Sequence, residues 1–146
     1  RKLDRLEAAT IKTLKIGYRK VDTYESMTFS GSPFTGGVLN PYICIPSNAK
    51  EKLSPEETEA VIAHELGHIH NFDLPIAILI QILGDLFWFV PGYRWLSRKI
   101  DRLREIVADQ WAIRKGVKAE LLASALVKLQ DLPESDSKFV VYSAFF

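Results

Sequence analysis

Apolar residues near the start of the chain recur at three- and four-residue steps, which is the period of an α-helix. Between Lys2 and Lys15 the recurring positions are Leu3, Leu6, Ala9 or Thr10, Ile11 and Leu14. The pattern predicts an amphipathic helix over residues 2–15, with one apolar and one basic face. Gly17 is the residue expected to end it.

The pattern changes after Tyr18, because β-branched and aromatic residues dominate from there to Pro46. This composition is typical of β-strands, and we expect at least two of them, separated by a turn over residues 30–37. Pro41 and Pro46 flank the second strand and cannot donate a backbone hydrogen bond. We therefore expect that strand to lie at the edge of the sheet.

Four helices are predicted in the remainder of the chain. The first begins with Ser54 as its N-cap, followed by Pro55 and, three residues after the cap, by Glu57, which is the signature of a capping box. The four predicted helices cover residues 54–71, 76–90, 93–115 and 118–130. Gly116 is expected to end the third of them.

The composition is that of a packed globular domain. The 146 residues include 47% apolar and 25% charged residues, and one domain over residues 1–146 is expected from this length. Nineteen basic and eighteen acidic residues leave a net charge of +1, which argues against binding to nucleic acid. The single cysteine, Cys44, excludes an intrachain disulfide and a cysteine-rich zinc site. Because the chain begins with Arg1, we expect it to be a fragment of a longer protein.

The first of these helices contains the sequence His64-Glu65-Leu66-Gly67-His68. Residues four apart lie on one face of a helix, so His64 and His68 can bind one metal ion together. Glu65 lies about 100° around the helix from His64, where it reaches a group bound to that ion instead of replacing a ligand. The spacing therefore predicts a zinc site with two histidine ligands and a general base.

A catalytic zinc ion needs a third protein ligand, which leaves a fourth position for water. Glu105 and Asp109 lie four residues apart in the predicted helix over residues 93–115, so both can point toward the ion. Glu105 is predicted to ligate it, and Asp109 to accept a hydrogen bond from the free N–H of a ligand histidine, His64. The alternative is that these carboxylates belong to a solvated salt-bridge face and the histidines are ordinary helix residues.

Two further candidates are interpreted more simply. His70 is two residues from His68 and points to another side of the helix, so we interpret it as a surface or packing residue. Asn71 and Asp73 fall where the helix is expected to end, and we interpret them as turn residues.

Three segments resemble the zinc-peptidase domain of membrane-embedded gluzincins. They are LSPEETEAVIAHELGHIHNFD, WFVPGYRWLSRK and REIVADQWA, over residues 53–73, 88–99 and 104–112. They are most similar to signal-transducer peptidases of the BlaR/MecR type, and the HELGH sequence is also similar to the heat-shock and CaaX-prenyl membrane proteases. The resemblance implies His64, His68 and Glu105 as zinc ligands, Glu65 as general base and Asp109 as a residue that supports a ligand.

The apolar stretch over residues 76–90 suggests contact with a membrane. As a helix it measures about 22 Å, which is short of the roughly 30 Å hydrocarbon layer, and it contains Gln81 and Asp85. We expect a buried or interfacial hairpin element in preference to a full span, with aromatic residues from Phe87 to Trp95 suited to a membrane boundary. The resemblance and the lone thiol favour a membrane-associated parent protein whose active site faces the cytoplasm.

Together these features predict an α+β, zincin-like domain: a small mixed or antiparallel sheet, a helix with the HExxH motif and a packed glutamate helix. The expected activity is that of a gluzincin-type zinc metalloendopeptidase with one Zn²⁺, which acts on a protein or peptide substrate in regulatory proteolysis. The substrate is expected to pair with the strand around residues 38–45. The alternatives are a non-catalytic zinc-bound regulatory module and a membrane-peripheral interaction domain.

Overall fold

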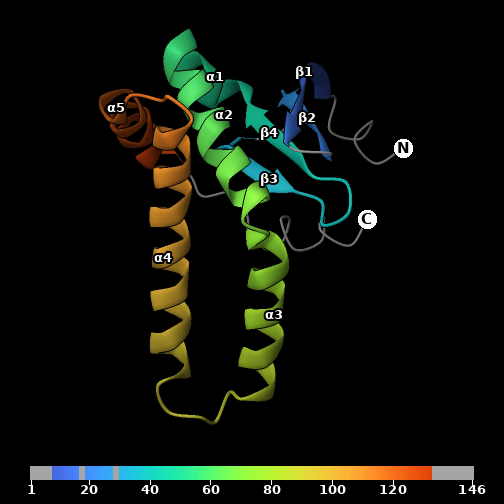
Figure 1. Ribbon diagram of the computed structural model, residues 1–146, viewed down its shortest axis with the longest axis vertical. Coiled ribbons are helices and arrows are strands. Elements are labelled where there is room, and N and C mark those ends of the chain that lie inside the picture. The colour runs from blue at the N-terminus through green and yellow to red at the C-terminus, as the bar shows by residue number, and fades with distance from the viewer. Residues whose placement is uncertain (1–7, 17–18, 28–29, 133–146) are drawn as a thin grey trace.

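The computed structural model describes residues 8–16, 19–27 and 30–132. Figure 1 shows a small sheet beside a group of helices, from which a two-helix hairpin extends. In chain order the elements are β1 (Ala8–Ile16), β2 (Arg19–Ser26), β3 (Phe34–Gly36), β4 (Tyr42–Pro46), α1 (Ser47–Lys52), α2 (Pro55–His70), α3 (Asp73–Leu86), α4 (Tyr93–Arg114) and α5 (Ala119–Gln130). The predicted α+β class with a small mixed sheet is confirmed.

The predicted helix over residues 2–15 is wrong where the structure describes it. Ala8–Ile16 forms β1, which pairs antiparallel with β2, while residues 2–7 and Gly17 lie outside the described part of the chain. The sequence of β1 contains Thr10, Ile11 and Thr13, whose β-branched side chains favour strands. Pairing with β2 therefore outweighs the weak helical period of this segment.

The position of the second predicted strand is also wrong. The strand order is β1-β2-β4-β3, so β4 lies inside the sheet, parallel to β2 and antiparallel to β3. Pro41 precedes β4 and Pro46 ends it, so neither proline removes a hydrogen bond from the middle of the strand. The edge on this side of the sheet is β3, which lies in the segment predicted as a turn, and β1 forms the other edge of the described sheet. A substrate therefore cannot pair with Tyr42–Pro46, because both sides of that strand are already occupied.

Helix α2 lies at the centre of the packing. Its Ile69 packs on Val21 and Ile43 of the sheet. Val61 contacts α5, and Ala60 packs in a cluster that includes Ala112 of α4. Because the sheet, α4 and α5 all hold this helix, the histidines on it have a fixed position.

The start of α2 agrees with the sequence. The hydroxyl of Ser54 accepts a hydrogen bond from the backbone N–H of Glu57, and the Glu57 carboxylate accepts one from the backbone N–H of Ser54. The predicted capping box is therefore confirmed. The short helix α1, which precedes it, was not predicted.

Helices α3 and α4 form the hairpin that extends from the rest of the molecule (Figure 1). Helix α3 begins earlier than predicted, at Asp73, because a proline is tolerated in the first turn and Pro75 lies there. The hydroxyl of Tyr93 donates a hydrogen bond to the carbonyl of Ile80 and so joins the two helices. Gly116 follows α4 with a φ of 99°, as expected for a residue that ends a helix.

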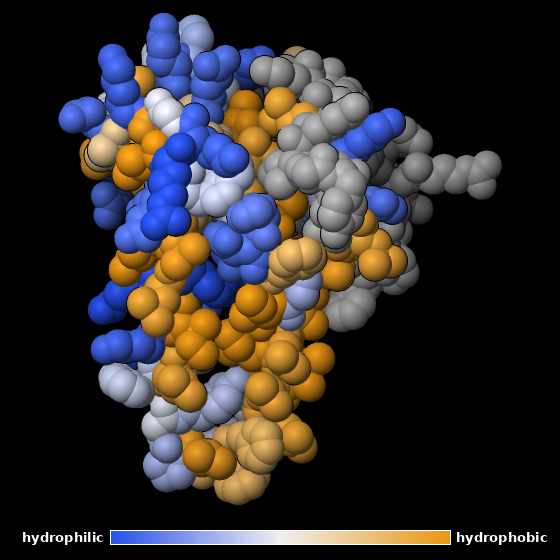
Figure 2. Space-filling view, in the orientation of Figure 1, coloured by the Kyte–Doolittle hydropathy of each residue, from blue (hydrophilic) through white to orange (hydrophobic). Residues whose placement is uncertain are grey.

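The hairpin exposes many apolar side chains, which form the orange lower half of Figure 2. Among the described residues, no helix taken alone is long and apolar enough to cross a bilayer. The pair α2 and α3, bent by 58°, meets the length and composition criteria when the two helices are taken together.

Candidate metal centre

A close crossing of two helices brings the candidate ligands together. His64 and His68 lie on α2, and Glu105 lies on α4. At the crossing, a Cβ atom added to Gly67 would lie 3.1 Å from both the Cα and the carbonyl oxygen of Ala108. Only a residue without a side chain fits this approach without displacing α4. Gly67 thus allows Glu105 to reach the histidines.

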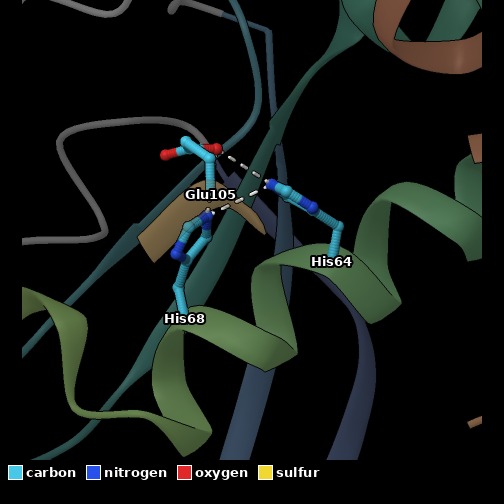
Figure 3. A group of neighbouring side chains, drawn as sticks. All are labelled: His64, His68 and Glu105. Carbon is cyan, nitrogen blue, oxygen red and sulfur yellow. Dashed lines mark hydrogen bonds and ion pairs between the residues drawn. The ribbon is translucent and has the colours of Figure 1, made fainter. Parts of the chain in front are cut away.

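The three side chains point toward one another (Figure 3). The two Nε2 atoms of His64 and His68 are 3.1 Å apart, and Glu105 Oε2 lies 3.5 Å from the first and 3.8 Å from the second. Zinc bonds of about 2.0–2.1 Å in a tetrahedral arrangement separate ligand atoms by roughly 3.4 Å. The spacing and the donor types, two imidazole nitrogens and one carboxylate oxygen, therefore fit a zinc ion.

The charges around His64 favour a cation. Burial acts to lower the pKa of His64, but its contact with Glu105 and the charges of Glu65, Asp109 and Glu105 together raise that pKa above its usual value. The contact with His64 in turn lowers the pKa of Glu105, against the effect of burial. The three carboxylates around the imidazole of His64 thus attract positive charge, whether a proton or a divalent ion.

Asp109 lies where the sequence predicts it, beside the other nitrogen of His64. Its Oδ1 is 2.9 Å from His64 Nδ1, although the alignment is too poor for a hydrogen bond in this arrangement. His64 is only 5% exposed, so water has little access to Nδ1. Among the described contacts, Asp109 is the side chain that lies beside this nitrogen. A carboxylate in this place favours the tautomer that leaves Nε2 free.

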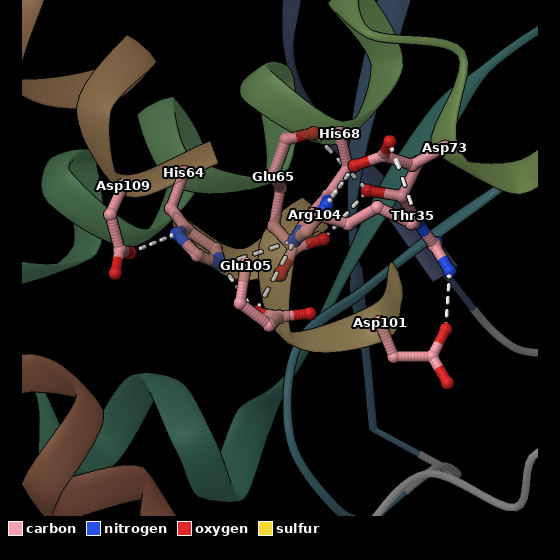
Figure 4. Close-up of polar contacts among 9 residues, drawn as sticks. All are labelled: Thr35, His64, Glu65, His68, Asp73, Asp101, Arg104, Glu105 and Asp109. Atoms are coloured by element: carbon pink, nitrogen blue, oxygen red, sulfur yellow. Dashed lines mark hydrogen bonds and ion pairs between the residues drawn. The ribbon is translucent and has the colours of Figure 1, made fainter. Parts of the chain in front are cut away.

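Asp73 occupies the corresponding position beside His68, and the sequence interpretation of Asp73 as a turn residue missed this contact. Its Oδ2 lies 2.6 Å from His68 Nδ1, and its Oδ1 lies 3.4 Å from Nε of Arg104 (Figure 4). Phe72 has a left-handed backbone, with φ of 58°, and this bend between α2 and α3 turns Asp73 back toward the histidine. The sequence shows an acid five residues after His68, but neither its burial nor this bend.

Glu65 is held from the sheet. The hydroxyl of Thr35, on β3, donates a hydrogen bond of 2.6 Å to Glu65 Oε2 (Figure 4). Thr35 was not singled out in the sequence, because its segment was predicted to be a turn. The strand and the helix thus meet at the predicted general base.

A cavity of about 540 Å³ opens beside the cluster. His64, Glu65 and Glu105 line its polar side. Its apolar lining includes Pro33, Val61, Leu126, Val127, Leu129 and Leu132. The cavity therefore combines the side chains of the candidate metal cluster with an apolar lining that comes largely from α5.

Two other reactive side chains lie outside the cluster. His70 is exposed, and its ring lies 5.5 Å from that of Trp111 between centroids, which agrees with a packing role. Cys44 is buried in the sheet, and burial raises the pKa of its thiol to about 12. A thiol with that pKa is protonated at neutral pH and is a poor nucleophile.

A pair of histidines four residues apart on one helix and a glutamate from a second helix form the donor set of a metallopeptidase-type domain. Comparison with known families agrees: the model of the family described as BlaR1 peptidase M56 matches residues 1–144. The chain belongs to that family.

The chain is also similar in sequence to individual proteins. The chain is 29% identical over 117 residues to the regulatory protein BlaR1 of Bacillus licheniformis, covering 78% of this chain and 19% of that protein. It is 28% identical over 93 residues to the methicillin resistance mecR1 protein of Staphylococcus aureus, covering 64% of this chain and 16% of that protein. It is 31% identical over 142 residues to the protease HtpX homolog 2 of Methanosarcina acetivorans, covering 71% of this chain and 48% of that protein. The chain therefore spans from about a sixth to about half of the length of these relatives.

Proposed function

We propose that this chain is a zinc-dependent endopeptidase domain that hydrolyses peptide bonds of a protein substrate, in regulatory proteolysis. The observation on which the proposal rests is the convergence of His64, His68 and Glu105 beside Glu65 and a cavity. Membership of a peptidase family supports the hydrolytic role. The names of the regulatory protein BlaR1 and the protease HtpX homolog 2 are consistent with regulation and proteolysis, respectively.

In this proposal His64, His68 and Glu105 hold one zinc ion, and Asp109 and Asp73 orient the two imidazoles. When bound, zinc supplies a water of lowered pKa, about 7, and polarises the carbonyl to be cleaved. A carboxylate beside each Nδ1 atom keeps a proton on that nitrogen. Each Nε2 atom then keeps its lone pair for the ion.

Glu65 moves the protons in the proposed reaction. Its carboxylate accepts a proton from the attacking water and then donates it to the leaving amine, so that one group serves as base and then as acid. Glu65 is 9% exposed, and it lines the cavity beside two of the proposed ligands. This position agrees with contact to a substrate bound in that cavity.

We propose that the substrate binds as an extended strand at the edge formed by β3 (Phe34–Gly36). β3 pairs with β4 on one side, and no described strand pairs with its other side. A peptide can therefore add to this edge by backbone hydrogen bonds. The apolar wall of the cavity would then accept one substrate side chain.

The hairpin supports association with a membrane. Its apolar exposed residues include Ile76, Leu79, Ile82, Leu86, Phe87, Trp88, Phe89 and Trp95. Arg94, Arg98 and Lys99 are exposed on α4 near the same end, where they suit anionic headgroups. We propose that this end of the hairpin contacts a bilayer in the parent protein, with the active site on the cytoplasmic side.

The activity is tested by Glu65→Gln. We expect this variant to bind zinc as the wild type does and to lose at least about a hundredfold in hydrolysis of an unstructured protein such as casein. Glu59→Gln, an exposed position on the same helix, is the matched control and should keep full activity. Normal turnover by Glu65→Gln would refute the assigned base, and a zinc-bound wild type without any hydrolysis would favour a structural zinc module.

A further inference from the structure

Thr35 makes a contact that the proposed reaction does not yet use. Its Oγ1 lies 2.6 Å from Oε2 of Glu65 and 3.4 Å from the main-chain oxygen of the same residue. A hydroxyl has one proton to donate, and the shorter distance assigns that proton to the carboxylate. In the part of the chain that the structure describes, no other side chain is recorded as a donor to Glu65.

The local sequence of β3 directs this hydroxyl toward α2. Side chains alternate between the faces of a strand, so Thr35 faces opposite to its neighbours Phe34 and Gly36. Both neighbours are buried, and a Cβ atom on Gly36 would lie 2.5 Å from the ring of Tyr42. Packing on one face therefore fixes the strand, and the Thr35 hydroxyl on the other face is held beside the helix.

We propose that Thr35 is a positioning residue for Glu65, an inference that rests on the proposed peptidase function. Its hydrogen bond fixes Oε2, which leaves Oε1 as the carboxylate oxygen to accept and return the proton of the water. A carboxylate held by a donor of this kind loses rotational freedom and stays in the productive orientation.

The same strand is the proposed edge for the substrate. Thr35 lies in the middle of the three residues of β3, so the base and the substrate backbone are aligned by one element. The contact therefore fixes the distance between the general base and the scissile bond. Removing it should slow the chemical step more than it weakens substrate binding.

The test compares Thr35→Val with Thr35→Ser in the 146-residue chain loaded with zinc. Valine keeps the shape but lacks the hydroxyl, and serine keeps the hydroxyl. We expect kcat to fall about tenfold or more in Thr35→Val, with KM within about twofold, and to return close to the wild-type value in Thr35→Ser. Zinc stoichiometry should be equal in all three proteins.

Thr23→Val is the matched control within the same sheet. Thr23 is fully buried on β2, and its Oγ1 has no hydrogen-bond partner, so the same substitution there removes no contact to the site. It should leave kcat unchanged. A second readout is the affinity for a peptide hydroxamate, whose acidic proton the same carboxylate accepts; Thr35→Val should weaken it about tenfold and Thr35→Ser should restore it.

The outcomes separate this proposal from the activity itself. If the wild type cleaves its substrate and Thr35→Val matches it in kcat and in hydroxamate affinity, the positioning role is refuted and the peptidase remains. If the zinc-loaded wild type and Thr35→Ser cleave nothing, the peptidase function fails and the positioning role with it. If Thr35→Val does not fold, Thr35→Ser and Thr35→Ala differ by the hydroxyl alone, and equal kcat in that pair refutes the proposal.

Discussion

Asp73 is the residue that links the proposed ligand His68 to the hairpin. It is 3% exposed, and its carboxylate lies between the imidazole of His68 and the guanidinium of Arg104. A buried carboxylate needs such partners, because an unpaired charge in the interior is costly. Arg104 directly precedes Glu105 on α4. The ion pair between Asp73 and Arg104 therefore also connects Glu105 to His68.

We expect Asp73→Asn to lower the affinity for zinc by about ten- to a hundredfold, because the weaker acceptor no longer favours the proton on His68 Nδ1. Competition with a chelator of known affinity measures the change. Asp101→Asn is the control, since Asp101 also contacts Arg104, at 3.0 Å, but is exposed and does not reach the histidines. Equal losses in both variants would show that only the position of Arg104 matters.

The sequence located some of these residues and not others for a geometric reason. His64, Glu65 and His68 share one helix, and Glu105 and Asp109 share another, so a four-residue spacing suffices to group them. The roles of these five residues stay predictions. The contact of Asp73 depends on the left-handed backbone of Phe72, and that of Thr35 depends on a three-residue strand, and neither follows from a periodic pattern.

Among the elements, α2 is fastened to α5 through Glu57. The Glu57 carboxylate accepts hydrogen bonds from the hydroxyl of Ser124 and from Lys128 Nζ, each at 2.7 Å, as well as from the backbone of Ser54. The bond from Lys128, followed by those from Ser54 and Ser124, lowers the pKa of Glu57 to about 2. This carboxylate therefore stays charged in the folded protein at a pH where it is neutral in the unfolded chain.

The consequence is a stability that depends on acid pH. In the unfolded chain Glu57 has an ordinary pKa of about 4.3 and takes up a proton first as the pH falls. Its contribution is thus complete above about pH 5 and is lost progressively toward pH 2. Glu57→Gln should be less stable than the wild type at pH 6, and the difference should shrink by pH 3 in urea unfolding. Glu56→Gln, at an exposed position beside it, should keep the wild-type dependence of the free energy of unfolding on pH. The same dependence in Glu57→Gln would contradict the lowered pKa of Glu57.

Elements with local signals were predictable, and elements defined by pairing were not. The capping box, Pro55 and Gly116 marked ends of α2 and α4 in the sequence alone. The strand β1 was mistaken for a helix because its pairing with β2 is invisible to a period count. The inner place of β4 likewise depends on β3 and β2, which the flanking prolines do not report.

At the scale of the whole molecule, the site lies where the packed end of the α3–α4 hairpin meets α2, and the hairpin carries most of the large exposed apolar side chains (Figures 1 and 2). Apolar surface of this extent is costly in water and marks a contact with lipid or protein. The sequence indicated such an element from its composition. It predicted an apolar hairpin, but not that the hairpin protrudes, since that depends on how α3 and α4 pack.

We expect the chain to bind vesicles through the end of this hairpin. Trp88 is 81% exposed, and Phe89 next to it is also exposed, so the double substitution Trp88→Asp and Phe89→Asp should reduce co-flotation with anionic vesicles at least about tenfold. The cleavage of a soluble substrate should persist. Met27→Asp changes an exposed apolar residue outside the hairpin and should not affect flotation. A wild type that stays out of the vesicle fraction would contradict the membrane contact.

The central claim is that His64, His68 and Glu105 bind one zinc ion, and metal stoichiometry tests it most directly. Zinc is measured after purification of the wild type, His68→Ala, Glu105→Ala and His70→Ala, the last being the control for a histidine outside the cluster. We predict close to one zinc per chain in the wild type and His70→Ala, and a large loss in His68→Ala and Glu105→Ala. Equal zinc in all four proteins would contradict the account.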